Sequence, residues 1–122
     1  MLTPTEVAKK AVQILDSKKA REITVLKTDK VTSLADYFII ATASSSTHGK
    51  TLVEETEKAL SEAGEPPLRR EGYRSGSWVL LDFGCVVVHV FLQETRQFYN
   101  LERLWSDATE IDYTTMLEEE KE

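Results

Sequence analysis

The chain has 122 residues, of which 41% are hydrophobic and 30% are charged, and its formal net charge is −6. This length suits one domain with a buried core, and the hydrophobic share excludes wholesale disorder. The acidic balance disfavours a dedicated DNA or RNA binder, which neutralises phosphates with a basic face, and favours a basic protein as the partner.

The compartment is indicated by what the sequence lacks. No apolar run approaches the roughly 20 residues that a membrane-spanning helix requires, so we expect no membrane association. The first residues lack the apolar segment of a signal peptide. The single cysteine, Cys85, excludes an intramolecular disulfide and fits a reducing compartment. Together these features predict a cytoplasmic protein.

The first predicted element is a helix near the N-terminus. Thr3 has the position of an N-cap, Pro4 that of the first helical residue, and Glu6 that of the partner residue in a capping box. An apolar stripe at helical spacing then extends the helix to about Ala20.

Two strands and a second helix are predicted next. Residues 22–27 alternate and are rich in β-branched side chains, whereas residues 36–43 are almost wholly apolar, as in a strand buried on both faces. The serine-rich run 44–47 supplies the N-cap of a helix over about residues 48–63. Gly64 has the position of the glycine that ends such a helix.

The apolar stretch WVLLDFGCVVVHVF, residues 78–91, predicts an antiparallel hairpin. A two-residue turn at Phe83–Gly84 would place Trp78 on the same face as His89. A turn lengthened by Asp82, with the glycine left-handed, would place Trp78 among the valines instead. We prefer the longer turn because phenylalanine resists positive φ. In both cases one face is aliphatic and belongs to the core, and the other is mixed.

The other segments complete the predicted organisation. Residues 65–77 are expected to be a loop, and residues 94–105 a loop that leads to a short helix. Residues 113–122 are expected to form an acidic, disordered tail, which leaves one domain over residues 1–112. The order of elements predicts an α/β fold in which helices pack on a mixed sheet of four to five strands.

Asp82 and His89 admit two interpretations. On adjacent strands they could be the acid and base of an enzyme, with a serine from residues 44–46 as nucleophile. However, no G-x-S-x-G elbow frames those serines, and a serine run before a helix is usually a cap. A histidine within a strand is more often a buried, hydrogen-bonded side chain. The alternative is that both residues mark a surface for a partner.

Metal and phosphate sites are not predicted. Two histidines and one cysteine without close spacing give no ligand set for a metal. Gly49-Lys50-Thr51 resembles the end of a phosphate-binding loop but lacks the upstream glycines that build the cradle of backbone amides. We therefore expect no metal and no other cofactor.

Large aromatic side chains concentrate in the second half of the chain. Trp78, Tyr99 and Trp105 suit an interface, because tryptophan and tyrosine dominate binding hot spots. Leu101 and Trp105 also fall at helical spacing and fit the inner stripe of a short helix. The pattern alone leaves core and interface equally open.

Three motifs carry a resemblance to a known family. They are D-Y-F-I-I-A-T from Asp36, G-S-W-V-L-L-D-F-G with V-V-V-H-V-F over residues 76–91, and R-x-F-Y-x-L-E-x-L-W from Arg96. Together they resemble the Iojap-like family, the ribosomal silencing factors, and the resemblance covers Thr3 to about Ile111. It implies a fold similar to nucleotidyltransferases without their catalytic motif, and therefore no enzyme.

The same resemblance implies a function and a site. The protein would repress translation when nutrients are limiting, by binding the large ribosomal subunit through its protein number fourteen and blocking the small subunit. Contact with rRNA would be peripheral at most. The residues expected at the partner-binding site are Trp78, Asp82, His89, Tyr99, Leu101 and Trp105, with Asp36 and Arg96 as supports.

Two alternative hypotheses stay open at this stage. One is a residual nucleotidyltransferase that uses Asp36 and Asp82 with magnesium. The other is a symmetric homodimer of the free protein through an exposed apolar sheet face. Asp36 could also simply cap the end of its strand.

Overall fold

The structure, a computed structural model, describes residues 2–28, 35–73, 77–99 and 108–118. Its strands are β1 (Arg21–Lys27), β2 (Tyr37–Ala43), β3 (Arg69–Glu71), β4 (Trp78–Asp82), β5 (Val86–Leu92) and β6 (Thr109–Ile111). Its helices are α1 (Pro4–Ser17), α2 (Ser46–Glu62), α3 (Gln93–Tyr99) and α5 (Tyr113–Glu118). None of these helices is long and apolar enough to cross a membrane.

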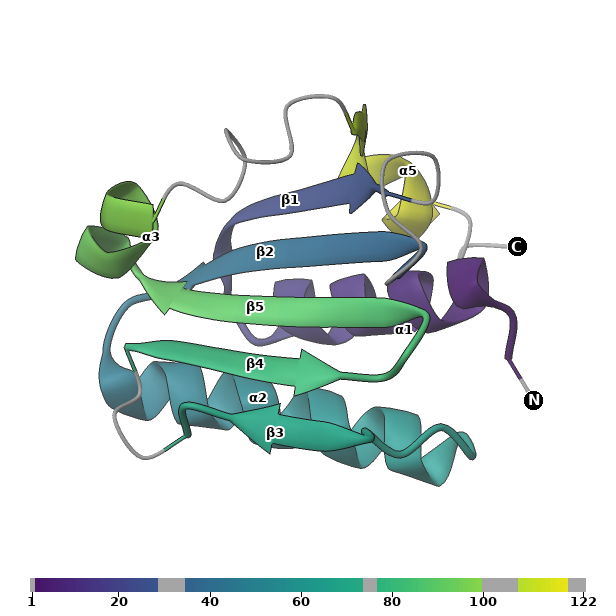
Figure 1. Cartoon of the computed structure of the whole chain (residues 1–122), viewed down its shortest axis with the longest axis horizontal. Coiled ribbons are helices and arrows are strands. Elements are labelled where there is room, and N and C mark those ends of the chain that lie inside the picture. Colours follow the sequence, from purple (N-terminus) through teal and green to yellow (C-terminus); the bar gives the residue numbers. More distant parts are fainter. Residues whose placement is uncertain (1, 29–34, 74–76, 100–107, 119–122) are drawn as a thin grey trace.

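The strands form one mixed sheet in the order β3-β4-β5-β2-β1-β6 (Figure 1). β2 and β5 are parallel, and the other neighbouring pairs are antiparallel. The predicted α/β class with a mixed sheet is confirmed. The sheet is larger than the four to five strands expected, because each edge carries a three-residue strand, β3 or β6.

The two faces of the sheet are covered differently. α1 and α2 lie behind the sheet in Figure 1 and pack on a core that includes Val25, Ile39, Leu81 and Val88. The opposite face, here called the aromatic face, has its own small cluster around Phe38, Ile40 and Phe91. Because side chains alternate along strands, it consists of Thr24, Leu26, Phe38, Ile40, Thr42, Trp78, Leu80, Asp82, Val87, His89 and Phe91.

The helix ends follow the predicted capping chemistry. Thr3 accepts the Glu6 N–H, and the Glu6 side chain accepts the Thr3 N–H, so the capping box is confirmed. At α2, Ser45 is the N-cap. Gly64 at φ +90° ends that helix, with its own N–H bonded to the Ser61 carbonyl and the next N–H bonded back into the last turn.

The hairpin turn between β4 and β5 differs from both predicted turns. Trp78 pairs with Phe91 and Asp82 with Val87, so the two central turn residues are Gly84 and Cys85. Positive φ at the first of these positions alone is typical of a type II′ turn. The preferred longer turn is therefore wrong. The two-residue alternative gave the correct faces but a register displaced by two residues.

Two segments that were predicted to be irregular contain a strand and a helix in the structure. β3 lies inside the predicted loop 65–77 and pairs with β4. α5 lies inside the predicted tail 113–122, where it packs against α1. Met116 of this helix is only 5% exposed and belongs to the main core. The disordered tail is therefore wrong for residues 113–118, and its last four residues lie outside the described part.

Candidate functional site

Trp78 is a half-buried aromatic side chain of the aromatic face, and two neighbours, Phe91 and His89, hold its ring. Its ring stacks on Phe91, the residue opposite on β5, with centroids 5.0 Å apart. Its Nε1–H donates to His89 Nδ1 at 3.1 Å. The His89 ring in turn contacts Phe38 of β2, with centroids 5.1 Å apart. Trp78 is thus fixed before any partner arrives, which lowers the entropy cost of binding.

His89 supports this arrangement from below the surface. The side chain is only 4% exposed, and burial lowers its pKa to about 4, so the ring is neutral at pH 7. Because Nδ1 accepts the Trp78 hydrogen bond, the proton resides on Nε2, which has no partner among the described residues. Direct contact of His89 with a partner is not supported by this burial. Its position suits a residue that orients Trp78.

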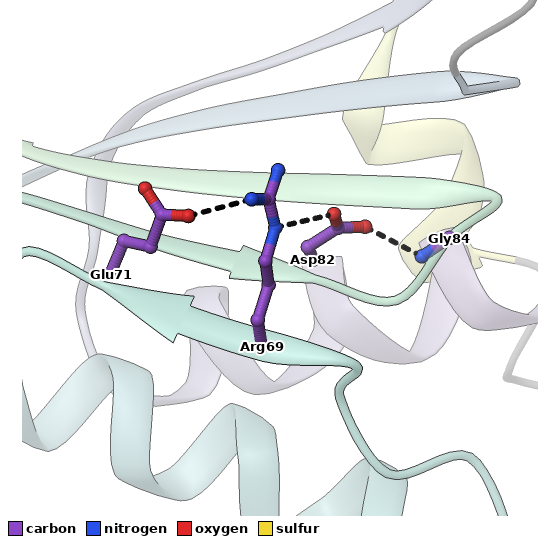
Figure 2. Close-up of polar contacts among 4 residues, drawn as sticks. All are labelled: Arg69, Glu71, Asp82 and Gly84. Carbon is purple, nitrogen blue, oxygen red and sulfur yellow. Dashed lines mark hydrogen bonds and ion pairs between the residues drawn. The ribbon is translucent and has the colours of Figure 1, made fainter.

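Asp82 belongs to an ion-pair network at the outer edge of the same face (Figure 2). Arg69 of β3 lies directly opposite and donates from Nε to Asp82 Oδ2 at 3.1 Å. Arg69 also pairs through Nη1 with Glu71 Oε2 at 2.8 Å. The second Asp82 oxygen, Oδ1, accepts the Gly84 N–H at 2.8 Å. One oxygen of Asp82 therefore stabilises the β4–β5 turn, and the other stabilises the pairing of β4 with the edge strand β3.

Sequence reasoning missed Arg69 and Glu71 because both fall in a segment interpreted as loop. The available signal was the charge pattern: opposite charges two residues apart lie on the same face of a strand. Arg70, between them, lies on the other face and pairs with Glu57 of α2 at 2.9 Å. This alternation is what a short charged edge strand shows, and charged edge strands resist pairing with other chains.

Arg96, expected as a support, is a buried anchor for α3. The side chain is 8% exposed, and its Nη1 donates to the Glu22 carbonyl at 2.6 Å and to Thr42 Oγ1 at 2.8 Å. Its Nη2 donates to Thr24 Oγ1 at 2.9 Å. The β1–β2 register shifts between Arg21 and Thr24, so Arg96 satisfies a carbonyl at a β-bulge. Arg96 therefore links α3 to β1 and β2.

The geometry does not support the enzyme hypothesis built on Asp36 and Asp82. Asp36 precedes β2, and its N–H bonds to the Cys85 carbonyl at 2.7 Å. Asp82 ends β4, and β5 lies between those strands, so two strand spacings of about 4.8 Å separate the two chains. Within the described ranges, no group of three histidine, cysteine or acidic residues could hold a metal ion.

The serine run has a structural role at the start of α2. Ser45 Oγ accepts the His48 N–H at 3.1 Å, as the cap interpretation predicted. The Ser44 hydroxyl lies 3.0 Å from His48 Nδ1, but that nitrogen already accepts the Ser44 N–H at 2.9 Å. The ring therefore closes a local turn. A base positioned for a serine nucleophile would need that nitrogen for the hydroxyl proton.

Three predicted site residues cannot be placed. Tyr99 is the last residue of α3, and its side chain is outside the described part of the structure, as are Leu101 and Trp105 entirely. Their partner-binding role, and the alternative that they belong to the core, both stay predictions. The structure brings Trp78 and His89 into contact, and it places Asp82 on the same face at the other end of β4.

Comparison with known proteins decides the family. Residues 2–122 match the family described as ribosomal silencing factor during starvation. The chain belongs to this family. It is 38% identical over 107 residues to the ribosomal silencing factor RsfS of Halalkalibacterium halodurans, covering 88% of this chain and 92% of that protein. The predicted family is thereby confirmed, and it is not a known enzyme family.

Two further relatives of the ribosomal silencing factor family extend the comparison. A crystal structure of a protein from Chromobacterium violaceum superposes with a TM-score of 0.84 at 40% identity, covering 86% of this chain and 88% of that one. A mouse protein named mitochondrial assembly of ribosomal large subunit protein 1 is 34% identical over 98 residues, which are 78% of this chain and 43% of that protein.

Proposed function

We propose that this ribosomal silencing factor is a cytoplasmic translational repressor that binds the large ribosomal subunit and keeps the small subunit from joining. Membership of the family over nearly the whole chain is the observation that carries the proposal. The name of the mouse relative, which refers to the large ribosomal subunit, supports the choice of subunit. The specific partner is the basic ribosomal protein number fourteen of that subunit, with rRNA at the periphery at most.

The β4 side of the aromatic face, where Trp78 and Leu80 are half-buried, has the properties that such a contact requires. Trp78 offers a large, half-buried ring whose orientation is already fixed by His89 and Phe91. Rigid aromatic anchors of this kind dominate the energetics of protein interfaces. The net charge of −6 favours a basic protein over rRNA phosphate, because opposite charges steer the encounter and like charges oppose wrong contacts. Blocking a docking surface requires bulk and affinity, and no chemical step.

Replacement of Trp78 by alanine is expected to weaken binding to isolated large subunits about thirty-fold, since hot-spot truncations cost roughly 2 kcal/mol or more. Co-sedimentation over a range of subunit concentrations measures the change. Tyr113→Ala on α5 is the matched control, because it also truncates a half-buried aromatic residue but lies on the helix side of the sheet.

Circular dichroism of each variant confirms that the fold survives. Wild-type affinity in Trp78→Ala would show that the aromatic face is not the contact surface. Absence of wild-type binding to large subunits would reject the proposed function itself.

A further inference from the structure

A small pocket opens beside Trp78, at the outer edge of the aromatic face. It has a volume of about 240 Å³ and is lined by Trp78 and Leu80 of β4 and by Glu71 and Gly72 of the neighbouring edge strand and its turn. One side is therefore aromatic and aliphatic, and the other carries a carboxylate. A pocket of this composition suits a side chain with an apolar stem and a cationic end.

The backbone beside the pocket tolerates little change. Gly72 has φ +77°, and a Cβ atom built on it would collide with the carbonyl oxygen of Trp78. Only glycine lets the chain leaving β3 approach β4 this closely. The close approach brings Glu71, which pairs with Leu80 across the two strands, to the same pocket as the Trp78 ring.

The acidic group available at this pocket is Glu71 and not Asp82. Both Asp82 oxygens are engaged, one by Arg69 and the other by the Gly84 N–H (Figure 2). Arg69 takes only one Glu71 oxygen, Oε2, and within the described residues Oε1 has no partner. The Glu71 side chain is 56% exposed, so a ligand can reach it. Arg69 thus holds Glu71 in place while leaving one oxygen open.

We propose that this pocket receives one arginine side chain of the basic partner, with the guanidinium on Glu71 and the stem against Trp78 and Leu80. The inference rests on the proposed function and assigns the chemistry of one contact within it. Arginine fits better than lysine, because a planar guanidinium stacks on an aromatic ring while it also donates to a carboxylate. The matching partner group is thus a protruding arginine on a ribosomal protein surface.

The first test measures binding of the full-length protein to isolated large subunits. Glu71→Gln keeps the size of the side chain and removes its charge, and it should weaken binding about five- to tenfold at low salt. Glu110→Gln is the matched control, because it removes the same charge from an exposed residue of β6, at the opposite edge of the sheet. Glu110→Gln should bind like the wild type.

The second test does not involve the ribosome. Titration of the ¹⁵N-labelled protein with N-acetyl-arginine amide at millimolar concentration should shift the indole resonance of Trp78, assigned with a Trp78→Phe variant. The shift should be absent in Glu71→Gln and present in Glu110→Gln. The lysine analogue should shift it less.

The possible outcomes separate the pocket from the function. If the wild type binds large subunits and Glu71→Gln binds equally well, the pocket assignment is overturned and the proposed function stands. If the wild type ignores large subunits, the function is rejected and the titration alone decides the pocket. An equal or larger shift with the lysine analogue contradicts the choice of arginine.

Discussion

Replacement of Arg96 by alanine is expected to lower the free energy of unfolding by about 3 kcal/mol, since each hydrogen bond to a charged group contributes roughly 1.5–3 kcal/mol, partly offset by desolvation. The guanidinium donates to the Glu22 carbonyl and to the hydroxyls of Thr24 and Thr42. Alanine leaves these acceptors unsatisfied and opens a cavity at the bulge of β1. Urea unfolding followed by circular dichroism measures the loss.

Arg70→Ala provides the matched control for this prediction. Arg70 is an arginine of β3 whose pair with Glu57 is solvent-exposed, and such pairs contribute at most about 1 kcal/mol. A lysine at position 96 should also fail to restore stability, because one ammonium cannot reproduce the planar fork. Equal losses in Arg96→Ala and Arg70→Ala would show that the buried contacts of Arg96 are not a main support of the sheet.

Acidification is expected to destabilise the protein through His89. Burial lowers the pKa of His89 in the folded state to about 4, whereas an unfolded histidine titrates near 6.5. Between these values the unfolded chain binds more protons than the folded one, so stability falls as the pH falls. This difference in pKa corresponds to roughly 3 kcal/mol of stability, which is present above pH 6.5 and lost by about pH 4.

Substitution of His89 by glutamine separates the effect of His89 on stability from the effect of carboxylates that titrate in the same pH range. Glutamine does not titrate, and its carbonyl can still accept the Trp78 Nε1–H. Urea unfolding of both proteins at several pH values measures their free energies of unfolding. From pH 7 to pH 4 the wild type should lose about 3 kcal/mol more than the glutamine variant. Parallel curves for the two proteins would mean that His89 is not held neutral by burial.

The helix ends and β2 could be predicted from the sequence, because each depends on residues that are close together in the chain. The capping box at Thr3 and Glu6, the Ser45 cap and the Gly64 terminus were all readable because each depends on residues within one helical turn. β2 was readable because seven consecutive buried residues leave no polar alternation. In these cases propensity and tertiary structure agree.

The errors arose where tertiary pairing decides the outcome. β3 and β6 have three residues each, too few for a period to show, and both are strands because a longer neighbour pairs with them. The turn was misplaced because Gly84 can take positive φ in several turn types, and only the register with β5 distinguishes them. Met116 looked like part of an acidic tail, although it reaches the core beside α1.

The partner-binding role of the candidate site stays a prediction. Trp78 and Asp82 share one face because they are four residues apart on β4, although the preferred turn had placed Trp78 among the valines. For His89 the sequence favoured a buried, hydrogen-bonded side chain, which the structure shows, whereas no pattern indicated the burial of Arg96 on α3. For Arg69 and Glu71 the charge pattern gave only a weak signal of a strand, and their place beside β4 depends on the β3–β4 pairing.

The central claim is that this protein acts by occupying a docking surface and not by transforming a substrate. The most direct measurement is a sucrose-gradient profile of separated large and small subunits recombined in magnesium, with the protein added beforehand. Wild-type protein should leave the subunits apart, while Trp78→Ala at the same concentration should allow them to join. Complete joining in the presence of excess wild-type protein would contradict the account.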